Sequence, residues 1–176
     1  MSDPVPPPEL GLEDDDLVES FEVLVDDETD LSGSSHRQSG FDGIGTRREA
    51  RERALALLFE AEQRGMNPLS EVLDDLPVAP DEYAVKLVLG VSSHLDELDT
   101  ELAELSDAWP LDRMPAIDRA LLRMGAFELI HTEVPVGACI SEAVELAKRY
   151  STEDSYRFVN GMLGAVARAV AGDRPD

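Results

Sequence analysis

The stretch TEDSYRFVNG near the C-terminal end of the chain holds side chains that could bind unpaired nucleic-acid bases. Within two helical turns it contains a carboxylate, a cation, an aromatic ring and an amide, at Asp154, Arg157, Phe158 and Asn160. An aromatic ring can stack on a base, and the polar groups can hydrogen-bond to its edges. Two other readings stay open: Phe158 as a core residue, and Asp154 as a helix cap or an ion-pair partner.

A second cluster, at the start of a predicted helix, could bind phosphate. It consists of four arginines with two glutamates among them: Arg47, Arg48, Arg51 and Arg53, with Glu49 and Glu52. Guanidinium groups suit phosphate, and the free amides of a helix N-terminus favour the same ligand. The glutamates also permit local ion pairs on a face that contacts only solvent. The cluster alone therefore leaves both interpretations open.

Metal and enzymatic chemistry find little support in the sequence. Glu128 and His131 form the Glu-x-x-His pair that di-metal helical bundles use, but such a site needs a second pair. Neither of the other two histidines has a glutamate at the matching position, so we expect no metal and place His131 at a helix end. The single cysteine, Cys139, is predicted to be buried. Because a Gly-rich phosphate loop is absent too, we expect no cofactor and no enzymatic activity.

The charge of the chain limits any nucleic-acid site to a small area. The 176 residues carry a formal net charge of −23. Residues 1–45 hold thirteen acids and one base, a net −12, and residues 46–176 still carry −11. Phosphate binding needs clustered cations, so this balance argues against general affinity for nucleic acid. An RNA site would be a basic island that a partner protein helps to complete.

Composition also predicts the domain organisation and location. Residues 1–45 contain too little apolar surface to order themselves and are predicted to be a disordered acidic extension, with a docking helix around residues 10–24 as the alternative. Residues 46–172 form the predicted folded domain and 173–176 a short tail. No apolar run approaches the ~20 residues of a membrane span, and the N-terminus is unlike a signal peptide. We expect a cytoplasmic protein.

Helical periodicity from Thr46 onward predicts an all-α bundle of about six or seven helices. The predicted segments are 46–64, 69–76, 80–109 as one helix or two, 112–132, one starting at 135, and 153–171. Thr46 is the expected cap of the first, and Ser151 or Thr152 that of the last. The helix of residues 112–132 is apolar on most sides and therefore central. Asp118 and Arg123 interrupt it and must pair internally, reach solvent or meet a partner.

These residues resemble the NusB family of transcription antitermination factors over about residues 46–171. The resemblance is carried by TRREARERALALLFE, DRALLRMGAFEL, VPVGACISEA, EAVELAKRY and EDSYRFVNGML. It implies the family's all-α bundle of two packed three-helix halves. Related rRNA cytosine methyltransferases carry this domain fused to a catalytic domain, for which this chain has no room.

The resemblance also implies a function. Family members bind boxA-type single-stranded RNA of ribosomal RNA leaders together with the small-subunit ribosomal protein NusE, in an elongation complex with NusA, NusG and RNA polymerase. Family bundles occur as monomers or as homodimers, and the sequence leaves that choice open. The alternative function is a protein-interaction scaffold of the same fold that has lost RNA binding.

The resemblance assigns roles to particular positions. The RNA-contacting residues that it implies are Arg47, Arg48, Arg51, Phe59, Arg123, Asp154, Arg157 and Phe158, and Asp118 is the implied partner contact. Phe59 stands where the family has a tyrosine that faces RNA. The predicted mechanism lays RNA across the first and last helices, with the arginines of the first helix on phosphates and residues 154–158 near bases.

Overall fold

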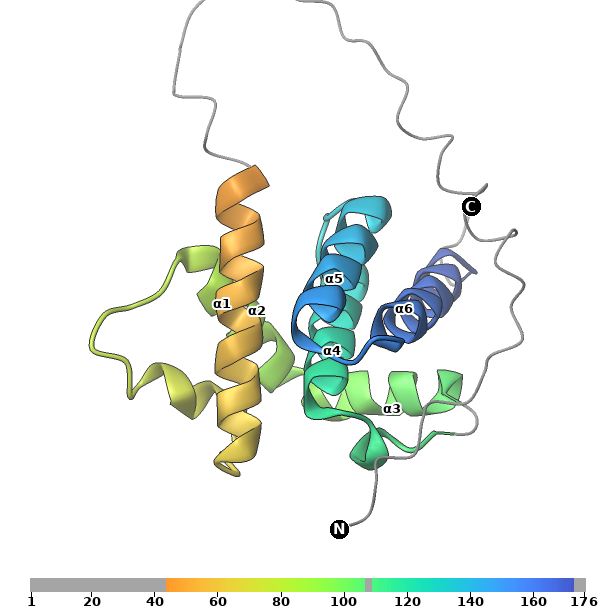
Figure 1. Ribbon diagram of the computed structural model, residues 1–176. Helices are drawn as coiled ribbons and strands as arrows, with labels where there is room; N and C mark the ends of the chain where they lie inside the picture. Colours follow the sequence, from red (N-terminus) through yellow and green to blue (C-terminus); the bar gives the residue numbers. More distant parts are fainter. Residues whose placement is uncertain (1–43, 107–108, 173–176) are drawn as a thin grey trace, which may run out of the picture.

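The computed structural model describes residues 44–106 and 109–172, and these residues form an all-helical fold (Figure 1). They contain six α-helices, two short 3₁₀-helices and no strand. In chain order the elements are α1 (Ile44–Gln63), η2 (Leu69–Leu73), α2 (Glu82–Ser93), α3 (Leu95–Leu105), η3 (Leu111–Arg113), α4 (Ala116–His131), α5 (Val136–Tyr150) and α6 (Ser155–Gly172). The predicted fold class is confirmed. The docking helix considered at residues 10–24 lies outside the described residues.

Prolines set the start of two central helices. Pro115 and Pro135 are the residues that precede α4 and α5, where a fixed φ and a missing N–H donor are tolerated. The predicted start of α4 at residue 112 was too early. Met114 is extended with ψ 148°, because a residue that precedes a proline disfavours the helical region, so residues 111–113 form the separate η3.

The long segment of residues 80–109 forms two helices. Asp81 caps α2, its carboxylate accepting a 2.8 Å hydrogen bond from the amide of Tyr83. The chain bends at His94, which ends α2 and precedes α3. The predicted cap at Thr46 was wrong, because α1 already begins at Ile44 and includes that residue.

Helix α4 is the centre of the core, as its apolar sequence predicted. It packs against the other five α-helices, and Leu121, Leu122 and Met124 are at most 1% exposed. Two glycines permit close approach to it. A Cβ on Gly125 would meet the methyl groups of Leu163, and a Cβ on Gly90 would overlap the tip of the Phe127 ring at its Cζ atom. The core therefore depends on small residues where α2 and α6 cross α4.

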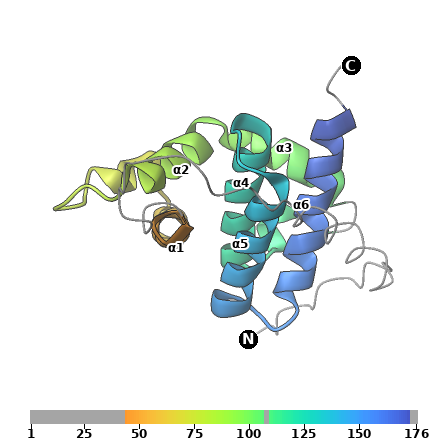
Figure 2. The same ribbon diagram turned by 90° about the horizontal axis from the view of Figure 1, so that it is seen from above.

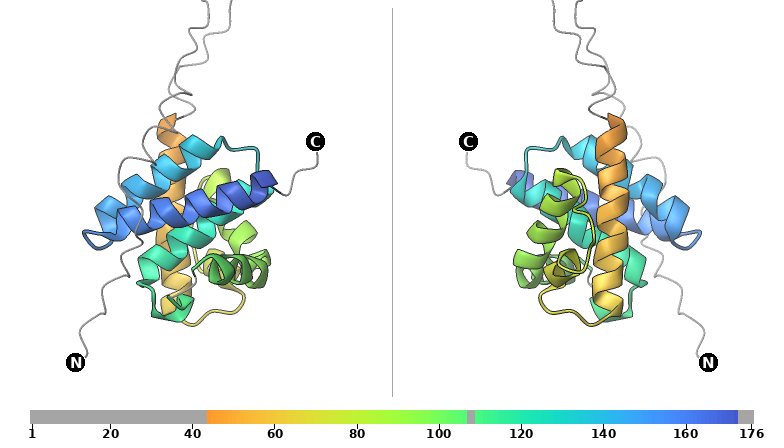
Figure 3. Two further views of the ribbon diagram at one scale, coloured as in Figure 1. Left: turned by 90° about the vertical axis from the view of Figure 1, so that its right-hand side faces the viewer. Right: turned by 90° about the vertical axis from the view of Figure 1, so that its left-hand side faces the viewer.

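The remaining helices lie on either side of this centre. Helix α1 packs with η2 and α2, whereas α5 and α6 pack with each other and with α4. Helix α3 packs more on α4 and α6 than on α2, so it joins the two halves. Seen from above, α4 and α5 lie between α1 and α6 (Figure 2), and side views place α1 and α6 on opposite faces (Figure 3). No described helix combines the length and apolar character that a membrane span requires.

Candidate nucleic-acid interface

Two of the predicted phosphate-binding arginines, Arg47 and Arg48, lie exposed near the start of α1. The Arg48 guanidinium forms a two-pronged ion pair with Glu142 of α5, with Nε–Oε2 and Nη2–Oε1 distances of 2.9 and 2.7 Å. Hydrogen bonds from Arg48 hold the pKa of Glu142 below its ordinary value. Arg47 lies over the Tyr83 ring, 5.4 Å from its centroid. The Arg48 side chain is still 53% exposed, so a phosphate can reach it in competition with Glu142.

The structure corrects the prediction for Arg51, which lies in the core with 4% exposure. Its Nε donates to both carboxylate oxygens of Glu128 on α4, at 3.0 and 3.1 Å, and the Tyr83 hydroxyl donates to the same carboxylate. Burial alone would lower the pKa of Arg51, but the bonds and charge of Glu128 outweigh it and raise the pKa. A guanidinium that is used in this way is not available to phosphate.

Arg123 is likewise an internal residue. Its Nε and Nη1 lie 2.6 Å from oxygens of Asp99 on α3 and of Glu62 on α1, and its side chain is 12% exposed. Arg119 also pairs with Glu62 and donates to two backbone carbonyls. The predicted RNA contact at Arg123 is therefore corrected to a network that joins α1, α3 and α4. The internal ion pair was one of the options that the sequence left open.

Asp118 is buried, with 1% exposure, and does not form a surface for a partner. Its two carboxylate oxygens accept hydrogen bonds from the hydroxyls of Ser151 and Ser155, the latter at 2.8 Å. Burial raises the pKa of Asp118 above its ordinary value, although these hydroxyl groups counteract the rise. The side chain fastens the turn between α5 and α6 to α4. Helix α6 begins at Ser155, two residues beyond the predicted residue 153.

The predicted base-binding cluster is divided between the surface and the core. Phe158 is 6% exposed and packs edge-on against Trp109, with ring centroids 4.8 Å apart, so the core reading of this residue is the right one. Asp154 and Arg157 are exposed at the start of α6. The Arg157 Nε donates to the Tyr156 hydroxyl at 2.9 Å, and its guanidinium lies over that ring. The surface cluster therefore has tyrosine rather than phenylalanine as its aromatic.

Further surface residues extend this cluster onto the end of α5, where the sequence prediction missed them. Lys148 lies 5.5 Å from the centroid of the Tyr156 ring. Arg149 lies over the neighbouring Tyr150 ring, which is 44% exposed, and both residues bond to Glu52 of α1. The run Lys-Arg-Tyr in the last turn of a predicted helix was the available signal. We call Lys148, Arg149, Tyr150, Tyr156 and Arg157 the α5–α6 corner.

The two predicted halves of the site do not adjoin each other directly. Because α5 lies between α1 and α6, the arginines at the start of α1 reach the α5–α6 corner only across the surface of α5 (Figure 2). The Arg48–Glu142 and Arg149–Glu52 pairs bridge this interval. Phe59 is partly buried in the second half of α1, and its predicted RNA contact stays a prediction. Tyrosines and cations thus form an interrupted path from α1 to α6.

The sequence of this bundle matches known proteins along most of its folded part. The family model described as the NusB family matches residues 48–168. The chain belongs to the NusB family. Transcription antitermination protein NusB of Kineococcus radiotolerans is 50% identical over 130 residues, which cover 70% of this chain and 94% of that protein. The protein of the same name from Salinispora arenicola is 48% identical over 128 residues, covering 69% and 94% of the two chains.

Solved structures agree with this membership in the NusB family. The structure of T. maritima NusB is 31% identical and superposes with a TM-score of 0.64, covering 69% of this chain and 90% of that one. A crystal structure of the antitermination factors NusB and NusE in complex with double-stranded RNA is 32% identical, with a TM-score of 0.61 and coverage of 72% and 99%. The predicted bundle is thus the NusB fold.

The histidine tested for metal binding has a different partner in this NusB-family chain. Glu128 is 1% exposed and is held by Arg51 and Tyr83, so it does not act together with His131. The His131 Nε2 lies 3.1 Å from a carboxylate oxygen of Glu97 on α3. His94, at the bend between α2 and α3, stacks beside His131. The His-x-x-Glu spacing of His94 and Glu97 is the sequence signal of this grouping, and it differs from the Glu-x-x-His pattern of di-metal bundles.

Proposed function

We propose that this chain is a transcription antitermination factor that binds boxA-type single-stranded RNA of ribosomal RNA leaders together with the ribosomal protein NusE. The observation that carries the proposal is the interrupted path of exposed cations and of exposed or partly buried tyrosine rings from the start of α1 to the α5–α6 corner. A relative with the same fold was solved with NusE and double-stranded RNA, which supports both partners. The proposed role is in rRNA transcription, in the cytoplasm, and is not enzymatic.

The two ends of the path suit different parts of an RNA strand. Arg47 and Arg48 present guanidinium groups for phosphates, where they fix position without reading sequence. Tyr150, which is 44% exposed, offers a ring on which an unpaired base can stack, a contact worth ~1–3 kcal/mol per base. Tyr156 is partly buried between Lys148 and Arg157, so a base reaches its ring only if one of these cations moves aside. Asp154 supplies a carboxylate at the start of α6 that can accept from a base edge. Sequence preference would therefore arise at the α5–α6 corner.

The charges on this surface predict that the chain alone binds RNA weakly. Glu142 and Glu52 already pair with the arginines on the path, and RNA must displace them. The net charge of −11 over residues 46–176 adds repulsion. A basic partner such as NusE would compensate by contributing its own cations to a composite site. NusA, NusG and RNA polymerase complete the proposed elongation complex.

A fluorescence-anisotropy titration with a boxA-like RNA and a scrambled control, with and without NusE, tests the proposal. The Arg47→Ala/Arg48→Ala double variant should lose affinity for both RNAs, whereas Tyr156→Ala should lose preference for the boxA-like RNA. Arg53→Ala is the matched control, because Arg53 is exposed on the same helix but on another face. With about three to five phosphates contacted, log K should fall against log salt with a slope of about −2 to −3.5.

Two results would count against this function. A slope near zero, with equal affinity for the two RNAs in the presence of NusE, would contradict RNA binding by this surface. The scaffold alternative predicts another pattern, in which the Arg47→Ala/Arg48→Ala variant loses NusE while its weak RNA affinity stays unchanged. The observation that favours the scaffold alternative is that Arg48 and Arg149 already form ion pairs with protein carboxylates.

A further inference from the structure

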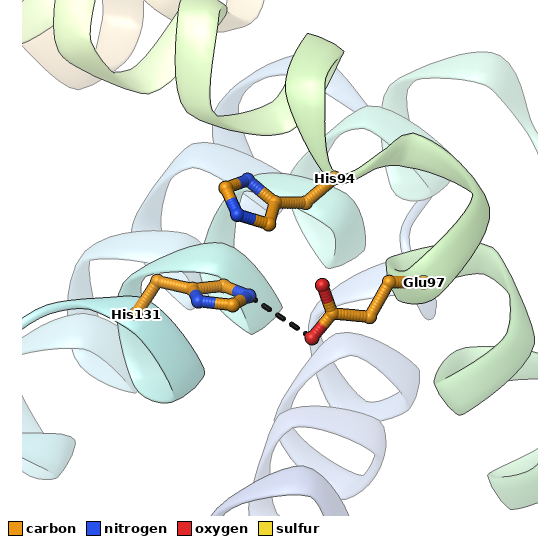
Figure 4. A group of neighbouring side chains, drawn as sticks. All are labelled: His94, Glu97 and His131. Carbon is orange, nitrogen blue, oxygen red and sulfur yellow. Dashed lines mark ion pairs between the residues drawn. The ribbon is translucent and has the colours of Figure 1, made fainter.

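Two histidines and a glutamate from three elements converge at one end of α4 (Figure 4). His94 lies at the bend between α2 and α3, Glu97 in the first turn of α3, and His131 is the last residue of α4. One potential ligand atom from each lies within 4.8 Å of the other two. The imidazole centroids of the histidines are 4.1 Å apart. This grouping lies outside the proposed RNA path.

The surroundings orient the His94 ring for coordination. Its Nδ1 lies 2.8 Å from the carbonyl oxygen of Gly90, a contact that a protonated Nδ1 makes as donor. The Nε2 atom then carries the free lone pair, the arrangement that second-shell hydrogen bonds give to metal-binding histidines. The Phe127 ring backs both imidazoles, with centroids 5.7 Å from His94 and 5.6 Å from His131. The rings therefore have one apolar wall and one open side.

We propose that His94, Glu97 and His131 bind a divalent transition-metal ion, with Zn²⁺ as the best-fitting probe. Two imidazole nitrogens and one carboxylate oxygen are a three-ligand set that zinc accepts, with water completing a tetrahedron. Ligands of this type favour zinc, nickel or copper over magnesium or calcium, which prefer all-oxygen sites. The present ion pair between His131 and Glu97 shows that two of the ligands already meet.

The charge of α3 favours a dication at this position. Besides Glu97, the helix carries Asp96, Asp99, Glu101 and Glu104 and has no basic residue. Arg123 neutralises Asp99, whereas Asp96, Glu101 and Glu104 form no salt bridge within the described part of the chain. An anionic helix raises the local concentration of cations.

The bound ion would act as a clip between the halves of the bundle. It would tie the bend after α2 and the start of α3 to the end of α4, because each element supplies one ligand. An ion that binds only the folded form raises the stability of that form by mass action. The predicted consequence is metal-dependent stability that is independent of RNA binding.

Isothermal titration of the full-length chain with Zn²⁺ tests the inference. We expect one equivalent to bind with a dissociation constant in the micromolar range, and the unfolding temperature to rise with it. Because second-shell changes already cost ~10–100-fold in metal affinity, His94→Gln or His131→Gln should each lower the affinity at least about 100-fold. Co²⁺ bound at the same site should show the visible absorption of a four- or five-coordinate ion.

Two matched controls separate this site from other ligands. Glu104→Gln removes a carboxylate from the same face of α3, about 10 Å further along, and should leave affinity unchanged. His36→Gln removes the only histidine outside the described residues and should also have no effect. Because His94 lies at a bend, circular dichroism must show that its variant is folded; if it is not, His131→Gln at the helix end decides.

The inference is overturned by any of three results: no saturable binding at millimolar Zn²⁺, binding that survives in the folded His131→Gln variant, or binding that disappears in His36→Gln. None of these depends on RNA or NusE.

Discussion

The buried Arg51–Glu128 ion pair should hold α1 against α4, and its removal gives the sharpest test of the distinction between core and surface arginines. Arg51→Met keeps a side chain of similar length but leaves the Glu128 carboxylate, 1% exposed, with the Tyr83 hydroxyl as its remaining donor. Removing one partner of a buried pair costs ~3–5 kcal/mol. Since a domain has a total stability of ~5–15 kcal/mol, the variant should lose a large part of it.

A second variant separates the buried charge from the loss of packing. In Arg51→Met/Glu128→Leu both charges are replaced by apolar groups, a change that is often neutral in buried pairs. The Tyr83 hydroxyl then lacks its acceptor, which costs ~1–3 kcal/mol. The double variant should therefore be more stable than Arg51→Met alone, and adding Tyr83→Phe should recover more. Urea unfolding followed by circular dichroism measures all three.

RNA affinity completes this test, measured at a temperature where every variant is folded. The Arg51→Met/Glu128→Leu variant should bind RNA as the wild-type protein does, in contrast to Arg47→Ala/Arg48→Ala. The reasoning is refuted if Arg51→Met costs less than ~1 kcal/mol, as an exposed pair would, and reduces RNA affinity in the folded protein. Such a result would place the Arg51 guanidinium at the surface in solution.

Three further outcomes follow from the packing and the charges. Gly90→Ala should lower the free energy of unfolding by ~1–3 kcal/mol because its Cβ overlaps the Phe127 ring, and a Phe127→Leu background should relieve the loss in a thermal melt. Phe158→Ala should cost ~3–5 kcal/mol in urea unfolding by leaving a cavity beside Trp109, and unchanged stability with lost RNA binding would contradict its core position. Burial alone would raise the pKa of Glu62, but its two arginine partners lower it overall below 4.5, so its contribution to stability is present above that pH and disappears on acidification. Glu62→Gln should therefore lower stability at neutral pH by ~1–3 kcal/mol, the cost of leaving its arginine donors without a charged acceptor, and flatten the decline on acidification, as measured by urea unfolding across pH.

The sequence predicted the helices well because local rules determine where they start and which face they bury. Pro115 and Pro135 each precede a helix because their fixed φ is tolerated there, and Asp81 precedes α2 because its carboxylate caps the first turn. The run of apolar residues in α4 predicted its central place for the same reason. The largest error, at the start of α4, arose because Pro115 keeps Met114 out of the helical region, so the helix begins at Ala116 and not at residue 112.

The site was predicted less well because similar residues in one cluster have different environments. Arg51 precedes Ala54, Leu55 and Leu58 at helical spacings and so lies on the buried stripe of α1, a signal that the arginine pattern concealed. Its partner Glu128 is distant in sequence, and only the tertiary fold brings the two together. Sequence alone therefore could place Arg51 on the buried stripe, but it could not identify Glu128 as the partner that makes this burial possible.

The hydrogen bonds of the buried Asp118 also affect how the α5–α6 corner can bind a ligand. By fixing the turn before α6, they hold Tyr150 and Tyr156 in place before any ligand arrives. A preorganised surface spends less conformational entropy on binding, so affinity is gained without a direct contact. A substitution of Asp118 would then loosen the α5–α6 corner and weaken ligand binding there. In a binding assay its effect would look like the loss of a residue that contacts the ligand directly.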